Sequence, residues 1–550
     1  MLESITLKFT EHENLVLPTT GITIFVGPNN SGKSLVLREL ETAFANANAI
    51  PELKILRDFD IRWPTLEKVN SALERHSPRM PPGSPPENCL VGRVDPNGGF
   101  ASSTLHKPSL LAIVNAKSDK QWLATNFLRW GLLRLDGRSR FNLTNDQPAG
   151  DLLAPAQNVL MNLFQDAHAR GKVRALVKDA FGLYFTVDPT QLGQFRIRLS
   201  QAEPPADEQS LNAAARDFYR QAVHIKDASD GVQAFTGIVT AVTSEEFHTI
   251  LIDEPEAFLH PPLARKLGKS LSSLATERGG ALIASTHSAD FLMGCVQASK
   301  DVRVIRLQHS EGKSRGRMVD PQELENLFKS PLMRSSNAVS GLFYDGVVVT
   351  ESDNDRAFYA EIYHRLLALD SNLPSVLFIN AQNKQTIKDI IRPLRKFGVP
   401  AAAIPDIDIV KDGGKTWLDW LDAVQIPNAL HAGYQDQRNT LKLRFEESGR
   451  NMKSDGGVAI LGVSDREAAE QLFDVLAQYG VFAVRRGEVE NWLPHLGVPG
   501  KKTDWSIAML QRLGSDPTAP EYVHPTDSDV WIFIRGVVGW IRDASRKGTS

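Results

Sequence analysis

Residues 22–34 read Ile-Thr-Ile-Phe-Val-Gly-Pro-Asn-Asn-Ser-Gly-Lys-Ser, and this stretch decides the fold of the first half of the chain. The apolar, β-branched run 22–26 is typical of a buried strand. The loop 27–34 that follows fits the pattern G-x-x-x-x-G-K-[ST], and residues 35–45 contain good helix formers without Gly or Pro. A strand, this loop and a helix in succession predict a phosphate-binding loop, whereas a chance glycine-rich turn would lack that context.

The residue types in the loop match the needs of a bound nucleoside triphosphate. Gly27 and Gly32 allow the backbone to turn its N–H groups toward phosphate oxygens. Lys33 supplies a positive charge to the terminal phosphates, and the Ser34 hydroxyl is a ligand for Mg²⁺. The predicted ATP-binding residues of the loop are Gly27, Asn29, Asn30, Gly32, Lys33 and Ser34.

An acidic motif expected beside the phosphates follows at residues 250–256, Ile-Leu-Ile-Asp-Glu-Pro-Glu. An apolar strand here ends in two adjacent carboxylates. We expect Asp253 to hold Mg²⁺ directly or through water, and Glu254 to orient or deprotonate the attacking water. A strand followed by a charged turn is the alternative, and the phosphate-binding loop argues against it.

Two further motifs complete the predicted nucleotide site. His287 follows the apolar run 281–285, 34 residues after Asp253, and is the candidate sensor of the γ-phosphate. A lone histidine at a strand end more often has a structural role. Ser229-Asp230-Gly231 precedes an apolar segment, and a helix-capping turn is its simpler interpretation.

Taken in order, these four motifs resemble the RecF/SMC/OLD branch of ABC-type ATPases over residues 1–340. The resemblance implies that Ser229 and Gly231 contact the γ-phosphate of a nucleotide held by a partner subunit, so we expect a homodimer or higher oligomer. The segment between Lys33 and Ser229 is too short for the coiled-coil arms of chromosome-maintenance ATPases, and a helical or dimerisation insert is expected within 60–220.

Two parts of this region have open interpretations. Gln121 is the candidate glutamine-loop residue of the resemblance. Residues 135–141, Leu-Asp-Gly-Arg-Ser-Arg-Phe, form a compact charged turn. Its arginines would contact nucleotide or nucleic acid in one interpretation and would be solvated in the other.

Residues 341–550 follow a second strand–helix alternation, which predicts a parallel, Rossmann-like α/β sheet. Acidic residues follow its strands, and parallel strands place their carboxyl ends along one edge of the sheet. Carboxylates gathered there repel one another unless a cation joins them, and oxygen ligands suit Mg²⁺ or Mn²⁺. Two such ions can clamp an in-line phosphodiester displacement. The predicted metal ligands are Glu351, Asp355, Asp406, Asp408, Glu488 and Glu490.

This second pattern resembles a Toprim domain, and an ABC-type ATPase followed by Toprim resembles the OLD family of ATP-dependent endonucleases. Glu351, as the first acid, and Asp406 and Asp408, as the Asp-x-Asp pair, match the catalytic acids of the family. The resemblance also implies a lysine toward the C-terminus, for which Lys501 and Lys502 are candidates. Ser352 stands where many Toprim proteins have glycine. The alternative to an active metal site is therefore an inactive Toprim fold whose acids are solvated.

The resemblance implies an ATP-controlled, divalent-metal-dependent nuclease acting on DNA, with RNA as the other possible substrate. It also implies a role in phage defence with an accessory defence protein. A non-catalytic, ATP-driven clamp for DNA repair or signalling is the alternative function.

Composition limits the remaining choices. The 550 residues suggest two to four domains at about 100–200 residues each. The net charge of −3 requires nucleic acid to bind at a local patch. No stretch approaches the roughly 20 apolar residues of a membrane span, and the N-terminus does not resemble a secretory signal. Cys89 and Cys295 fit a reducing cytoplasm. The apolar pattern in 527–546 predicts a packed helix.

Overall fold

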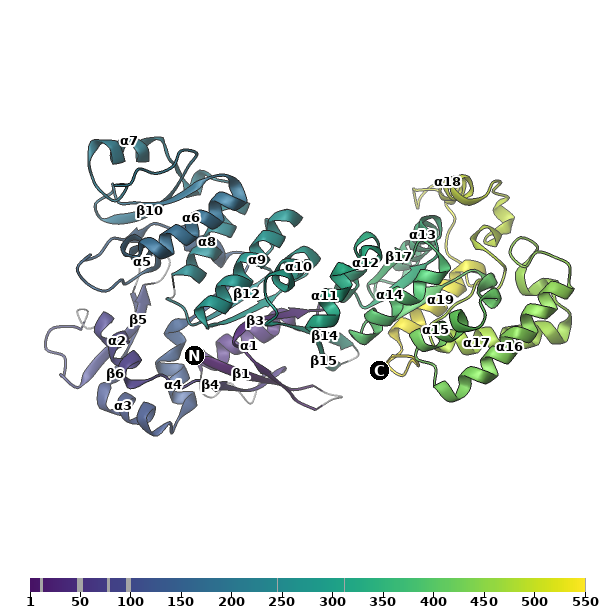
Figure 1. Cartoon of the computed structure of the whole chain (residues 1–550), viewed down its shortest axis with the longest axis horizontal. Helices are drawn as coiled ribbons and strands as arrows, with labels where there is room; N and C mark the ends of the chain where they lie inside the picture. The colour runs from purple at the N-terminus through teal and green to yellow at the C-terminus, as the bar shows by residue number, and fades with distance from the viewer. Residues whose placement is uncertain are drawn as a thin grey trace. The chain divides into compact units, whose positions relative to one another are not determined.

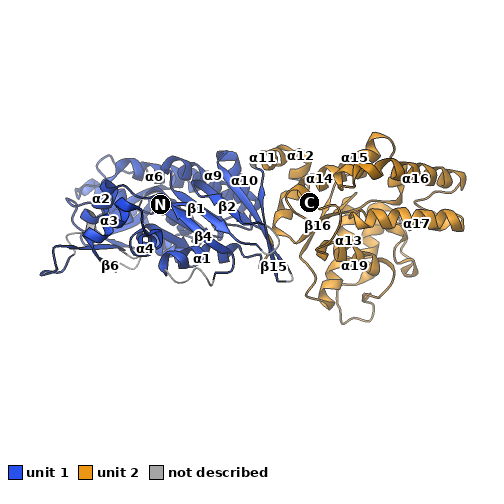
Figure 2. Cartoon of the chain, turned by 90° about the horizontal axis from the view of Figure 1, so that it is seen from below, with its two compact units in different colours: residues 1–26, 30–321 blue, residues 27–29, 322–550 orange. Residues whose placement is uncertain are grey.

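The computed structural model describes residues 1–9, 13–46, 53–76, 80–94, 100–244, 246–310 and 312–549, which form two compact units (Figure 2). One unit comprises residues 1–26 and 30–321, and the other comprises 322–550 together with the short segment 27–29.

The first unit is built around a mostly parallel sheet. Its strands are β3 (Gly21–Val26), β7 (Leu132–Leu135), β12 (Thr249–Asp253), β13 (Ala281–Ser285), β14 (Val302–Ser310) and β15 (Lys313–Val319). β12 pairs in parallel with β13 and β7, β14 pairs in parallel with β3, and β15 is antiparallel to β14. The backbone N–H of Thr286 donates to the Phe25 carbonyl over 3.1 Å, so β3 and β13 lie side by side. Every residue of β3 is buried, as expected for an inner parallel strand.

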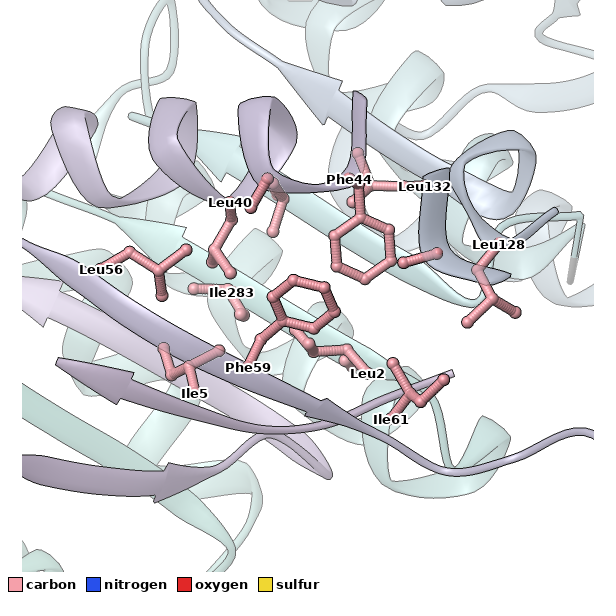
Figure 3. Close-up of a cluster of buried hydrophobic side chains, with 14 of the residues drawn as sticks. Leu2, Ile5, Leu40, Phe44, Leu56, Phe59, Ile61, Leu128, Leu132 and Ile283 are labelled. Atoms are coloured by element: carbon pink, nitrogen blue, oxygen red, sulfur yellow. The ribbon is translucent and has the colours of Figure 1, made fainter. Parts of the chain in front are cut away.

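Helix α1 (Lys33–Ala45) packs between this sheet and a second, antiparallel one of strands β2 (Leu15–Pro18), β1 (Leu2–Leu7) and β4 (Leu56–Ile61). Figure 3 shows Leu40 and Phe44 of α1 within a cluster shared with Phe59 of β4 and Ile283 of β13. The Phe44 and Phe59 rings lie 4.9 Å apart. Fully burying each such side chain stabilises the fold by about 1.5–3 kcal/mol. The cluster therefore fixes α1, and with it Lys33 at its first turn.

Within residues 60–220, where a helical or dimerisation insert is expected, β7 belongs to the central sheet and divides the segment into two groups of elements. Before β7 lie a β-hairpin and one group of helices, and after it lie a small antiparallel sheet and a second group of helices (Figure 1). The first group consists of α2 (Leu66–His76), β5 (Asn88–Val94), β6 (Phe100–His106), α3 (Lys107–Ala116) and α4 (Lys120–Asn126). The second consists of β8 (Gln147–Pro148), α5 (Val159–Gln165), α6 (Ala167–Phe181), β9 (Tyr184–Asp188), β10 (Gln194–Ser200), α7 (Ala213–Gln221) and β11 (Val223–His224). β9 and β10 pair as an antiparallel hairpin.

Three helices of the first unit follow the nucleotide motifs. They are α8 (Asp230–Thr243), α9 (Pro261–Arg278) and α10 (Ala289–Ala298). Glycine allows α9 and α10 to approach closely, since a Cβ on Gly294 would lie 2.1 Å from the Arg265 carbonyl oxygen. The unit ends at Pro321, after the β14–β15 hairpin, and the rest of α11 (Pro321–Lys329) belongs to the second unit.

The second unit contains the predicted parallel sheet, with strand order β17-β16-β18. The strands are β16 (Gly346–Thr350), β17 (Val376–Asn380) and β18 (Ala401–Ile404), and the helices are α12 (Pro331–Ser335), α13 (Asp353–Leu369), α14 (Lys384–Lys396), α15 (Lys415–Ala423), α16 (Asn428–Glu447), α17 (Val463–Gln478), α18 (Lys502–Leu513) and α19 (Asp529–Arg542). Val348 of β16 packs with residues of α13, α18 and α19 in one buried cluster. The helix predicted within 527–546 is α19.

Glu488 and Glu490 do not follow a strand, because residues 481–487 form none. Val481 bridges Ala403 of β18, and Val484 bridges Asp406, two residues after that strand, so the segment is extended chain held at these two points. In the part of the chain that the structure describes, no helix has the length and apolar character needed to cross a membrane.

Candidate functional site

The loop between β3 and α1 has a backbone suited to anion binding. Gly27, Asn30 and Gly32 have φ angles of 145°, 61° and 97°, in the left-handed region that glycine adopts most easily. Gly32 is also in close contact with its surroundings, because a Cβ there would lie 2.4 Å from Ile55 Cδ1. Gly32 precedes the first residue of α1, so the N–H groups of that helix end, which have no partner within the helix, face the loop.

Lys33, Ser34 and Asp253 meet at this loop. Ser34 Oγ donates a hydrogen bond to Asp253 Oδ1 over 2.8 Å, and Ser285 Oγ donates to the same oxygen. Burial lowers the pKa of Lys33 to about 8, although the charges of Glu254 and Asp253 oppose that shift. A phosphate would favour the charged form of Lys33. The Ser34 hydroxyl and the Asp253 carboxylate therefore lie together where a nucleotide-bound Mg²⁺ would need oxygen ligands.

Glu254 and His287 lie together beside this group. His287 Nε2 is 3.8 Å from Glu254 Oε1, and the His287 backbone N–H donates to Glu256 Oε1 over 2.9 Å. Glu254 is exposed and has a left-handed backbone with φ of 51°. Burial lowers the pKa of His287, and the charge of Lys33 adds to this effect. An accessible carboxylate beside a neutral imidazole can orient and accept a proton from water.

Ser229 and Gly231 lie at the N-terminus of α8. Ser229 is the N-cap residue of this helix, and its side chain makes no capping hydrogen bond within the described residues. Ser229 thus occupies the cap position that the simpler interpretation expected, but without a side-chain capping hydrogen bond. Gly231 permits a close approach, since a Cβ there would lie 2.7 Å from the Phe258 carbonyl oxygen.

Two interpretations from the sequence are corrected here. Gln121 Nε2 donates to the Ala43 carbonyl over 2.8 Å, near the C-terminal end of α1, so it is held away from the loop that precedes this helix. Arg140 is neither solvated nor placed to contact nucleic acid, because it is fully buried. Its guanidinium donates to backbone carbonyls of the turn after β12. Arg138 is exposed, as one interpretation of the turn expected.

Three acids of the second unit converge at the carboxyl ends of β16 and β18. Oxygen atoms of Glu351, Asp406 and Asp408 lie within 4.8 Å of one another. The Asp406 backbone N–H donates to Glu351 Oε1 over 3.0 Å. Burial, together with the charge of Asp406, raises the pKa of Glu351 to about 8.

This cluster fits a divalent cation. Asp408 Oδ1 is buried and has no hydrogen-bond partner among the described residues, which is costly unless another ligand satisfies it. Close, mutually repelling carboxylates with a free oxygen suit Mg²⁺ or Mn²⁺. Glu351, Asp406 and Asp408 are the residues that would hold the ion.

Asp355 lies beside the cluster and also caps α13. Asp355 Oδ2 accepts a hydrogen bond from the Ser352 N–H over 2.9 Å, and the Ser352 hydroxyl accepts one from the Asp355 N–H over 3.3 Å. This reciprocal capping explains why a serine fits where Toprim proteins often have glycine. Burial raises the pKa of Asp355 to about 6, with a further contribution from Asp406.

The lysine at the cluster is Lys453, which the sequence analysis missed. Lys453 Nζ forms an ion pair with Asp406 Oδ2 and lies 3.8 Å from Glu488 Oε2. Its position in a polar, glycine-bearing loop, residues 451–457, gives no signal of a site. Glu490 lies outside the group of three acids, and its Oε1 accepts a hydrogen bond from the Lys502 backbone N–H over 2.7 Å. Burial raises the pKa of Glu488, and the positive charge of Lys501 opposes part of that shift.

The affinity for Mn²⁺ should depend on pH. Below about pH 8 the metal-free protein holds a proton on Glu351, which a bound ion must displace. Isothermal titration calorimetry is expected to show affinity rising by up to about tenfold per pH unit between pH 6 and 8, and then levelling. The unfolded state, with a pKa near 4.5, holds fewer protons in this range, so the unfolding free energy of the metal-free protein falls as pH rises through it. An affinity that does not change between pH 6 and 8 would contradict this assignment.

Comparison with known protein families gives two matches. Residues 160–294 match the model of an AAA domain that is described with the AbiEii toxin of a type IV toxin–antitoxin system. Residues 342–408 match the TOPRIM domain of overcoming-lysogenization-defect-protein-like proteins, and this range contains Glu351, Asp406 and Asp408.

Two curated relatives are OLD nucleases. The Old nuclease of Escherichia phage P2 is 22% identical over 272 residues, which cover 46% of this chain and 44% of the phage protein. The chain therefore spans less than half the length of that relative. The OLD nuclease of Thermus scotoductus is 22% identical over 450 residues, covering 74% of this chain and 82% of its own.

Among solved structures, an SMC head bound to the C-terminal winged-helix domain of ScpA has a TM-score of 0.34 and 14% identity, covering 59% of this chain and 99% of its own. The SMC head domain of Thermotoga maritima has a TM-score of 0.29 and 13% identity, covering 57% and 98%. Scores this low add nothing to the sequence matches. From these matches, an AAA-type ATPase domain precedes an OLD-like Toprim domain in this chain, and the chain is similar to OLD nucleases.

Proposed function

We propose that this protein is an ATP-hydrolysing, divalent-metal-dependent nuclease that cuts DNA. The observation that carries the proposal is the convergence of Glu351, Asp406 and Asp408, with oxygens within 4.8 Å, at the carboxyl edge of the Toprim sheet. The names of the two nuclease relatives support the reaction class. Because Ser352 forms part of a helix cap, its presence no longer favours the non-catalytic clamp.

In the proposed nuclease reaction, bound Mg²⁺ or Mn²⁺ supplies Lewis-acid stabilisation of the scissile phosphate and an activated water. Glu351, Asp406 and Asp408 would hold the ions. The ammonium of Lys453, already paired with Asp406, is placed to neutralise charge that develops on a phosphate oxygen. Burial lowers the pKa of this lysine, but its hydrogen bond to Asp406 and the charges of neighbouring acids raise it overall, so it stays protonated.

In the proposed ATPase reaction, Lys33 binds the terminal phosphates and Ser34 and Asp253 hold Mg²⁺. Glu254, with His287 beside it, orients the attacking water. Ser229 and Gly231, at the exposed N-terminus of α8, would complete the site of a second copy of the chain, so we propose a homodimer.

Replacing Glu254 with Gln should slow ATP hydrolysis while preserving ATP binding. The amide keeps the size of the side chain but cannot accept the proton from water, and such general-base contributions are typically 10²–10⁴-fold. Steady-state phosphate release and fluorescent-nucleotide binding would check this. Wild-type turnover in Glu254→Gln would remove Glu254 from this role.

The substrate class is tested with supercoiled plasmid, linear duplex DNA and a folded RNA, each with Mn²⁺, with and without ATP. Cutting of DNA supports the proposal, whereas cutting of RNA alone would show that RNA is the substrate. Absence of cutting on every substrate would contradict the nuclease proposal.

A role in phage defence, alone or with an accessory defence protein, predicts that expressing the chain lowers phage plating and that Asp408→Ala restores it.

A further inference from the structure

Arg140 is a fully buried arginine directly behind the proposed catalytic turn of the ATPase. Its Nη2 donates to the carbonyl oxygens of Asp253 at 2.8 Å and Glu254 at 3.0 Å. Its Nη1 lies 3.4 Å from the Pro255 carbonyl oxygen and 3.5 Å from that of Ala257. One guanidinium thus contacts four backbone carbonyls within residues 253–257.

The turn that Arg140 holds has an unfavourable backbone. Glu254 and Phe258 have φ angles of 51° and 71°, in the left-handed region where a residue with a Cβ is strained. Such a conformation persists only when the surroundings enforce it. The carbonyl contacts of Arg140 provide that enforcement at Glu254, the residue proposed to orient water.

The short 3-10 helix Ser139–Thr144, which carries Arg140, also connects the turn to the helix of the Ser229 motif. The Phe141 and Phe258 rings meet edge to face, with centroids 5.1 Å apart. A Cβ on Gly237 of α8 would lie 3.2 Å from the Arg140 carbonyl oxygen, so this 3-10 helix packs directly on α8. The Phe258 carbonyl in turn faces Gly231 at the start of α8. The turn therefore lies against both the 3-10 helix of Arg140 and the N-terminus of α8.

We infer that Arg140 is a positioning residue of the ATPase: it holds the 253–257 turn so that the Glu254 carboxylate faces the γ-phosphate site. This inference rests on the proposed ATPase function. Lysine cannot replace it, because an ammonium is a point charge and does not span several carbonyls as the planar guanidinium does. A displacement of about 1 Å at a catalytic group can cost as much as 10²-fold in rate.

The test compares Arg140→Lys with wild type by single-turnover ATP hydrolysis and by fluorescent-nucleotide binding. We expect the rate to fall about tenfold to a hundredfold with little change in ATP affinity, because the phosphate-binding loop is unaltered. Arg170→Lys is the matched control. Arg170 is also buried and donates to the Leu163 and Phe164 carbonyls and to Glu208, so this variant should lose thermal stability but keep its rate.

A double-mutant cycle separates positioning from general destabilisation. If Arg140 acts through Glu254, then Arg140→Lys adds no further loss in a Glu254→Gln background. A wild-type rate in Arg140→Lys, a matching loss in Arg170→Lys, or a full additional loss in the double variant would overturn the inference. Absence of ATP hydrolysis by the wild-type protein would instead refute the proposed ATPase and, with it, this role.

Discussion

Replacing Asp406 with Asn is expected to abolish Mn²⁺ binding by the second unit. Asp406 is the central acid of the cluster, since its backbone bonds Glu351 and its side chain pairs with Lys453. The amide removes one negative charge and leaves the Lys453 ammonium without its closest counter-charge. Mutating a residue that only hydrogen-bonds to a metal ligand typically lowers metal affinity by 10–100-fold. Replacing a ligand itself should therefore lower the Mn²⁺ affinity by at least about a hundredfold.

Calorimetric titration of the apoprotein and the Mn²⁺-induced rise in Tm measure this effect. Asp527→Asn is the control, because Asp527 is an exposed acid of the same unit, 97% accessible and paired with Arg535. It should bind Mn²⁺ like the wild type. Retention of wild-type affinity by Asp406→Asn would show that the ion, if bound, lies elsewhere.

Replacing Lys33 with Ala should remove most of the ATP affinity. Lys33 is 4% exposed at the start of α1, and burial lowers its pKa to about 8. Its ammonium has the position to pair with phosphate oxygens, and charged hydrogen bonds of this kind contribute about 1.5–3 kcal/mol each. An affinity loss of about tenfold to 150-fold follows for a single lost bond.

Arg38→Ala is the matched control for this loss, because Arg38 is an exposed basic residue of the same helix. Its removal should leave ATP binding unchanged. The pKa near 8 adds a second expectation: ATP affinity of the wild type should fall above about pH 8, as the free protein loses the Lys33 proton. Equal affinities for wild type and Lys33→Ala would contradict the assignment of the loop.

The sequence predicted those parts of the fold and the site that depend on neighbouring residues. The β3–loop–α1 unit and the strands at 346–350, 376–380 and 401–404 are local patterns of apolar period, glycine and helix formers. The convergence of Glu351 with Asp406 and Asp408 also followed from the sequence, because parallel strands end at one edge.

The missed features depend on contacts between distant segments. Lys453 reaches Asp406 from a loop with no motif, and Arg140 reaches the turn after Asp253 across more than a hundred residues. Glu490 has the residue type of a metal ligand, but its segment folds so that the Lys502 backbone N–H donates a hydrogen bond to its Oε1. Charge and polarity alone do not distinguish such a buried partner from a solvated side chain.

The most direct test of the account is cleavage of supercoiled plasmid with Mn²⁺ by wild type, Asp406→Ala and Lys33→Ala, each with and without ATP. The account predicts nicked or linear DNA with the wild type and none with Asp406→Ala. It also predicts that any effect of ATP disappears in Lys33→Ala. Cleavage that survives in Asp406→Ala would show that the Glu351–Asp406–Asp408 cluster is not the nuclease site.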